Sequence, residues 1–159
     1  MVRVRAEALK AEGYAVYVEA QNKITFKGQA ATLGGVPDLV AVRGGEGFVI
    51  GCKSGKQRDS DFFQVHTYMR VLPITHAACR GVPPAGEVQY GDTPLRIAPG
   101  QLTDELKGLI RGTIERVGSA ALAVKVPSLS ECRCPRSRPR TALRVDEEQS
   151  RAAVDHDLF

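Results

Sequence analysis

The sequence contains no tryptophan, and aromatic residues make up only 6% of the chain. No apolar run approaches the roughly 20 residues that a helix needs to cross a bilayer, which excludes a membrane-spanning protein. The basic first residues continue into Ala6 and Glu7 and not into the apolar segment of a secretory signal. We therefore expect a cytoplasmic protein that has no membrane partner.

Cysteine is scarce as well, and its four occurrences follow no repeated spacing: Cys52, Cys79, Cys132 and Cys134. In a cytoplasmic protein this favours free thiols over disulfides. Charge of one sign is not abundant either, because 22 Lys and Arg residues against 18 Asp and Glu residues leave a net charge of +4. A surplus this small indicates an acidic partner such as DNA only weakly.

The sequence does contain enough hydrophobic residues, 43% of 159, for one domain with one core. Their periodicity predicts helices over 1–12, from residue 59 or 60 to the region of Pro73, and from Thr103 to about residue 117. Strands are predicted over 14–19, 24–26, 36–42, 48–53, 87–90 and 95–97. This order is typical of a small α/β domain in which helices pack on a central mixed sheet.

The chain changes character after residue 126. Five arginines crowd a proline-containing stretch over 133–144, and acidic residues follow from Asp146. We expect a folded domain over 1–126, and over 127–159 a basic, cysteine-containing segment with an acidic tail, partly disordered. The arginines, Arg133 and Arg136 among them, either contact nucleic-acid phosphates or are simply solvated.

Asp38 and Lys53 are the residues whose spacing first indicates chemistry. Asp38 stands near the start of one predicted strand, and Lys53 ends the strand that returns after the glycine-rich turn at 44–47. A tight hairpin brings Asp38 beside residues 51–53, and side-chain alternation puts residues 51 and 53 on one face. Such a cleft suits phosphodiester hydrolysis, because Mg²⁺ prefers carboxylate oxygens and a lysine stabilises the transition state. Alternatively, Asp38 only caps a turn and Lys53 is a solvated strand-edge charge.

Three motifs follow one another in this part of the chain: Pro37-Asp38, then Gly51-Cys52-Lys53-Ser54-Gly55, then Gln64 and Tyr68 on one helix. An amphipathic helix also produces Gln–Tyr pairs at this spacing by chance. Together the motifs resemble the RecB-like branch of the PD-(D/E)XK nuclease superfamily, which has a Pro-Asp pair, an acidic-x-Lys triplet with Ser/Thr-Gly, and Gln-x-x-x-Tyr. The resemblance covers about residues 5–135.

The resemblance implies a restriction-endonuclease-like fold, a central mixed β-sheet flanked by helices. It implies a Mg²⁺- or Mn²⁺-dependent DNA nuclease that acts on single strands or ends. Asp38 and the carbonyl of Cys52 would be metal ligands, and Lys53 the catalytic lysine. Gln64 and Tyr68 would lie at the site and help to hold DNA.

The resemblance further implies a glutamate on the first helix, for which Glu7 is the best match and Glu19 a weaker one. Lys56 and Arg58, beyond the lysine motif, are candidate contacts to nucleic acid, as are Arg133 and Arg136. Short chains of this branch lack accessory domains, so we expect a homo-oligomer or a larger DNA-processing complex.

Gly51 departs from the pattern, because the family has Asp or Glu at this position as a second metal-binding carboxylate. Without it the metal loses charge compensation, so the chain is either an impaired nuclease or a DNA-binding or complex-forming module that does not cleave. A carboxylate elsewhere, Glu46 or Glu19, could substitute, or glycine could have replaced the acid in a once-active enzyme. A third hypothesis is a small α/β protein in which these motifs are coincidental.

Cys132 and Cys134 resemble the cysteine-containing end of relatives that hold an iron–sulfur cluster. A four-iron cluster usually takes four cysteine ligands, and this segment supplies two. We therefore expect a degenerate remnant and no iron–sulfur cluster.

Overall fold

The computed structural model describes residues 1–28 and 31–119, which belong to one compact unit, Met1–Ala123. The predictions made for residues 127–159, including the roles of Arg133, Arg136, Cys132 and Cys134, fall outside these ranges. Within the described ranges, no helix combines the length and the apolar character that crossing a membrane requires.

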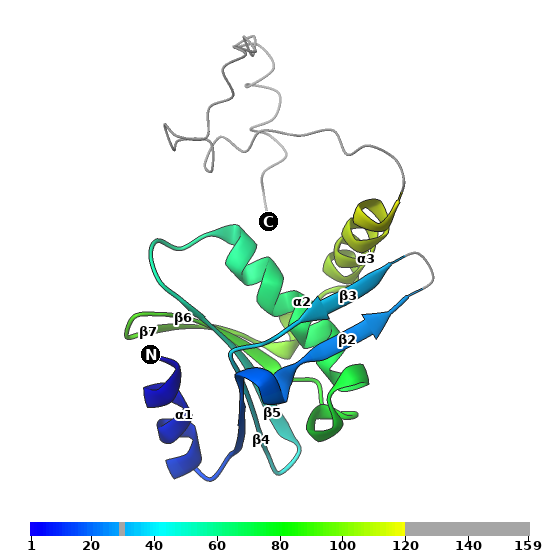
Figure 1. The fold of residues 1–159 in the computed structure, drawn as a ribbon. Coiled ribbons are helices and arrows are strands. Elements are labelled where there is room, and N and C mark those ends of the chain that lie inside the picture. The colour runs from blue at the N-terminus through cyan, green and yellow to red at the C-terminus, as the bar shows by residue number, and fades with distance from the viewer. Residues whose placement is uncertain (29–30, 120–159) are drawn as a thin grey trace. The chain divides into compact units, whose positions relative to one another are not determined.

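A five-stranded mixed sheet forms the centre of this unit (Figure 1). Its order is β1-β4-β5-β6-β7, with bounds Ala15–Val18, Leu39–Arg43, Glu46–Lys53, Ala85–Tyr90 and Thr93–Ile97. β5 and β6 pair in parallel, whereas the other neighbours pair antiparallel. A parallel pair needs a crossover connection, and α2 (Asp59–Thr75) lies in it. The coarse prediction of an α/β domain with a central mixed sheet and flanking helices is confirmed.

α1 (Val2–Ala11) and α2 cover opposite faces of this sheet (Figure 1). Strand alternation divides the core between them. On one face the buried residues of α1 pack against odd-numbered residues of β4 and the even-numbered Ile50 of β5: Ala6, Leu9, Leu39, Ala41 and Ile50. On the other face the buried residues of α2 pack against the remaining strand positions: Val65, Met69, Leu72, Val40, Val49 and Val88.

A separate hairpin of β2 (Ile24–Lys27) and β3 (Thr32–Gly35) lies on the α2 side, where Ile24 joins the same core. A strand was predicted at β2, but none was predicted over residues 32–35. Gly34 and Gly35 provide no side chain from which a strand pattern could be recognised, so the pairing with β2 defines this strand.

Two glycines allow close packing around α2. A Cβ atom on Gly86 of β6 would lie 2.7 Å from both Met69 Sδ and Val65 Cγ1. A Cβ atom on Gly35 of β3 would lie 2.8 Å from Cε1 of Tyr68. Real Cβ atoms do not approach this closely, so glycine at both positions lets α2 rest directly on the strands.

Two helix ends lie close to their predicted positions. α3 (Asp104–Gly118) begins directly after Thr103, whose side chain caps the helix by accepting a hydrogen bond from Leu106 N. α2 continues past Pro73 to Thr75. His76 N donates to Leu72 O, and Thr75 Oγ1 donates to Val71 O. These bonds complete the last turn although Pro73 cannot donate one.

Candidate functional site

Asp38 lies beside the end of β5. In the β4–β5 ladder Leu39 opposes Ile50, so Asp38 comes next to Gly51 in the register. The carboxylate Oδ2 of Asp38 accepts a hydrogen bond of 2.7 Å from the backbone N–H of Cys52. Because the N–H and C=O of one strand residue point to the same edge, the carbonyl of Cys52 also faces the Asp38 side of β5.

Asn22 holds the turn that presents Asp38. Its side chain is fully buried, and its Nδ2 donates to Tyr17 O at 2.9 Å and to Pro37 O at 3.1 Å. Glu19 N donates to the carbonyl of Asp38 at 3.2 Å, and Glu19 has a left-handed φ of 45°. No role in the site was predicted for Asn22. Its position in a short polar segment between two strands indicates only a turn.

Lys53 points to the same face of the sheet as α2. Its Nζ donates to Oε1 of Gln64 and lies 3.7 Å from Oδ1 of Asp61. The position of Gly51 agrees with this orientation, because a Cβ atom there would lie 3.1 Å from Val65 Cγ2 and 3.7 Å from Lys53 Cε. Residues 51 and 53 therefore share the α2 face.

Tyr68 connects this group to Asp38. Gln64 Nε2 donates to the hydroxyl of Tyr68 at 3.3 Å. Burial raises the pKa of Tyr68, and the nearby Asp38 carboxylate raises it further. The structure thus brings Asp38, Lys53, Gln64 and Tyr68 together on one face.

Asp61 and Tyr90 extend the group, and the sequence analysis missed both. The Tyr90 hydroxyl donates to Asp61 Oδ2 at 2.6 Å and accepts from Arg58 N at 3.2 Å. Burial raises the pKa of Tyr90, and the hydrogen bond to the Asp61 carboxylate acts in the same direction. This network fixes the carboxylate of Asp61 beside Lys53. Asp61 reads in the sequence as an ordinary acidic residue of a first helical turn, so no signal marked it.

Two glutamates proposed from the sequence do not join this group. Glu7 is exposed and forms an ion pair with Lys10 at 3.0 Å, on the helix that covers the other face of the sheet. Glu46 contacts Tyr14 and Arg43 at the start of β5. It precedes position 51 by five residues, or about 17 Å along a strand, and so cannot replace the missing carboxylate there. Glu19 remains adjacent to Asp38 through its backbone.

Few oxygen atoms near Asp38 are available to bind a metal ion. Among residues 1–28 and 31–119, no group of three or more His, Cys, Asp or Glu side chains is placed to hold a metal ion. Asp38 and the carbonyl of Cys52 supply two oxygens. Mg²⁺ often binds through one or two carboxylates, with waters and substrate phosphates completing its shell. The residues therefore fit a weak Mg²⁺ or Mn²⁺ site that depends on a bound phosphate.

The thiol of Cys52 does not contribute to such a site. Burial raises its pKa, and the Asp38 carboxylate raises it further, so the thiol remains protonated at neutral pH. Its side chain packs with the core on the α1 face. Only the backbone of Cys52 faces Asp38.

A cavity of about 430 Å³ adjoins Gln64 and Tyr68. It lies between β3 and the first half of α2, and its lining combines apolar, polar and backbone groups: Leu33, Gly34, Ser60, Asp61, Phe63, Gln64, Thr67 and Tyr68. Lys56 and Arg58 are exposed in the segment between β5 and α2. The cavity therefore lies beside the group formed by Lys53, Gln64 and Tyr68.

No protein-family model matches this sequence, and no curated protein matches it significantly.

Proposed function

We propose that this chain is a divalent-metal-dependent DNA nuclease of the PD-(D/E)XK type, with a restriction-endonuclease-like fold, whose cleavage is weak because Gly51 leaves the metal with one carboxylate. The observation that carries the proposal is the convergence of Asp38 and Lys53. The Asp38 carboxylate accepts from Cys52 N, and Lys53 reaches Gln64, all on the face beside the cavity.

The chain's own residues have distinct roles in this proposal. Asp38 and the carbonyl of Cys52 would hold Mg²⁺ or Mn²⁺, and the ion would supply activation of water and neutralisation of phosphate charge. Lys53 donates to a phosphate oxygen or to the attacking water, and its cationic charge stabilises the negative charge that develops there. Gln64 positions the lysine through the hydrogen bond between Nζ and Oε1. The Tyr68 hydroxyl donates a hydrogen bond to a phosphate oxygen, and burial keeps the phenol protonated by raising its pKa.

A module of the same fold that binds DNA without cleaving it is the second candidate. It is favoured by one specific observation: the described residues contain no group of three or more His, Cys, Asp or Glu side chains that could hold a metal ion. In this alternative the charge of Lys53 is balanced by its ion pair with Asp61 and has no catalytic role. The basic residues Lys56 and Arg58 then supply the affinity for phosphates.

A pair of substitutions at one position separates the two candidates. Gly51→Asp restores the second carboxylate, and Gly51→Asn adds a side chain of the same shape without the charge. Both place a Cβ atom 3.1 Å from Val65 Cγ2, so they disturb the packing equally. The comparison therefore isolates the charge.

The assay measures cleavage of single-stranded and double-stranded DNA with Mn²⁺. We expect slow cleavage by the unmodified chain, at least about tenfold faster cleavage by Gly51→Asp, corresponding to ~1.4 kcal/mol of transition-state stabilisation, and no gain with Gly51→Asn. Adding Asp38→Asn or Lys53→Met to Gly51→Asp should abolish the gain. No cleavage by the unmodified chain, with cleavage by Gly51→Asp, would favour the binding module. Absence of cleavage in every variant would contradict a nuclease site at these residues.

A further inference from the structure

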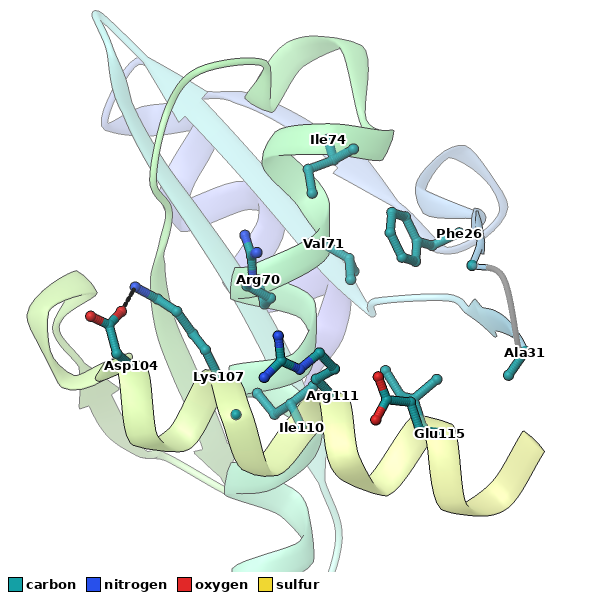
Figure 2. Close-up of a pocket in the computed structure, with 13 residues that line it drawn as sticks. Phe26, Ala31, Arg70, Val71, Ile74, Asp104, Lys107, Ile110, Arg111 and Glu115 are labelled. Carbon is teal, nitrogen blue, oxygen red and sulfur yellow. Dashed lines mark hydrogen bonds and ion pairs between the residues drawn. The ribbon is translucent and has the colours of Figure 1, made fainter. Parts of the chain in front are cut away.

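A second cavity, of about 500 Å³, lies farther along α2. It is bounded by the second half of α2, by the β2–β3 hairpin and by α3, and Figure 2 shows side chains from all three at its walls. None of its lining residues belongs to the Asp38–Lys53 group. Its floor is apolar and includes the buried residues Val71 and Ile110 with the half-buried ring of Phe26.

Two arginines face this cavity from opposite sides. Arg70 comes from α2 and Arg111 from α3, and both side chains extend into the gap between the helices (Figure 2). Both residues are exposed, and neither takes part in an ion pair within 4.0 Å among residues 1–28 and 31–119. Lys107 also lines the cavity but is paired with Asp104 at 2.8 Å. Glu115 of α3 lines the cavity as well (Figure 2). The two arginines thus provide cationic groups above an apolar floor, with one carboxylate beside them.

α2 connects the two cavities. Phe63 and Thr67 line the first, and Arg70 and Ile74 line the second. These four positions follow the i, i+4, i+7, i+11 spacing, so they form one stripe along the helix. From Gln64 to Arg70 the helix rises about 9 Å, at 1.5 Å per residue. That length corresponds to about two or three phosphates of a stacked strand, at 3.4 Å each.

We propose that the cavity at Arg70 and Arg111 is a second subsite, which holds a phosphate of an unpaired nucleic-acid strand that runs along α2 from the Asp38–Lys53 site. The inference rests on the proposed function and names its substrate class. Guanidinium groups pair with phosphates through two parallel hydrogen bonds. A base of the same strand stacks on Phe26 at the apolar floor. Because the two arginines approach from facing helices, the ligand must pass between them, which suits one strand and not a duplex.

The test measures binding of a fluorescent oligothymidylate of about ten nucleotides, within the usual site size of single-strand binders. Fluorescence anisotropy is recorded at several salt concentrations with EDTA present, so that no cleavage occurs. The variant is Arg70→Ala/Arg111→Ala. Its matched control, Arg3→Ala/Arg80→Ala, removes the same charge from exposed positions that line neither cavity.

We expect the Arg70→Ala/Arg111→Ala variant to bind about tenfold more weakly and its log–log salt slope to fall by about 1.4, or 0.7 for each lost phosphate contact to a single strand. The control should change the affinity less than twofold. Arg70→Lys/Arg111→Lys keeps both positive charges and should retain most of the salt slope. If the lysine variant keeps the slope and the alanine variant loses it, the loss comes from missing phosphate contacts and not from misfolding.

Four results would overturn the inference. Equal binding by the alanine variant and the control would show that the arginines do not contact the strand. An acidic peptide that competes as well as the oligonucleotide would assign the cavity to a protein partner. If the unmodified chain binds no oligonucleotide even at low salt, the proposed function fails as well. Binding that depends on Lys53 and Gln64 but not on the arginines would leave the proposed function standing and remove only the subsite.

Discussion

The backbone N–H of Cys52 donates to the carboxylate of Asp38 across 2.7 Å. This bond joins the residue before β4 to Cys52 near the end of β5, just beyond Leu39 and Ile50, the last residue pair of the β4–β5 ladder. Asp38 therefore has a structural role in addition to the catalytic role proposed for it. Substitutions of Asp38 should affect the stability of the protein and the binding of metal differently.

Asp38→Asn and Asp38→Ala should distinguish these roles. Asparagine retains an oxygen that accepts from Cys52 N, so the free energy of unfolding should change by less than about 0.5 kcal/mol, whereas alanine leaves this N–H without its partner and should cost about 1 kcal/mol. In the Gly51→Asp background, both should eliminate Mn²⁺ binding in calorimetry. Urea unfolding supplies the stability values. A loss of stability in Asp38→Asn equal to that in Asp38→Ala would contradict the structural role of the oxygen.

Gly35→Ala should destabilise the protein. The new Cβ would lie 2.8 Å from Tyr68 Cε1 and 3.1 Å from its hydroxyl, and displacing the ring costs about 1 to 3 kcal/mol, as overpacking does. Gly34→Ala is the matched control, because nothing lies within 4 Å of a Cβ at that neighbouring position. Thermal unfolding compares the two. Equal midpoints would show that Tyr68 does not pack against β3.

Asn22→Ala should lower stability by about 1 to 3 kcal/mol, because the carbonyls of Tyr17 and Pro37 lose their donor in a buried position. Asn22→Asp should cost more, since a carboxylate oxygen would then face two carbonyl oxygens. Gln21→Ala, at the exposed neighbour that accepts from Val18 N, is the control and should cost less than Asn22→Ala.

A second measurement ties Asn22 to the site. In the Gly51→Asp background, Asn22→Ala should weaken Mn²⁺ binding, because the Pro37 carbonyl that precedes Asp38 is no longer held. Unchanged metal affinity would restrict Asn22 to a purely structural role.

Stability should fall in alkaline solution because of Cys79. Burial raises the pKa of this thiol from 9.0 to about 11, and the side chain is fully buried. The folded state therefore holds the proton more tightly than the unfolded state. The resulting stability is fully present below pH 9.0 and is lost as the pH rises towards about 11. Two pKa units correspond to about 2 to 3 kcal/mol.

Urea unfolding under reducing conditions, from neutral pH to about pH 11, measures this loss. Cys79→Ala is the comparison. It should be less stable at neutral pH, because a buried sulfur is removed, but should lose less stability across the alkaline range. A parallel decline in both proteins would assign the alkaline loss to other groups, such as Tyr68 and Tyr90, whose pKa values are also raised.

Part of the site follows from the sequence because strand geometry is regular. A short glycine-rich turn and a two-residue period suffice to place Asp38 beside residues 51–53 and to put residues 51 and 53 on one face. The α2 positions of Gln64 and Tyr68 follow from helical spacing in the same way. These relations are local, so neighbouring residues determine them.

The remaining parts of the site depend on relations that are distant in the sequence. Tyr90 reaches Asp61 from another hairpin, and no pattern within either segment indicates that contact. Glu7 was chosen by its place on the first helix alone, whereas Ala6 and Leu9 define the buried side of α1 and leave Glu7 exposed. β3 was missed because two of its four residues are glycines, which carry no hydrophobic signal.

Gly86 sets the clearance between α2 and the sheet. With hydrogen in place of a side chain, β6 lies directly beneath Val65 and Met69, and the helix comes low enough for Gln64 to meet Lys53. Any larger residue at position 86 would act as a spacer and lift the helix away from β5. The contact between Lys53 of β5 and Gln64 of α2 thus depends on the small size of Gly86 in the neighbouring strand β6. Gly86 has no polar side chain and belongs to no part of the proposed site.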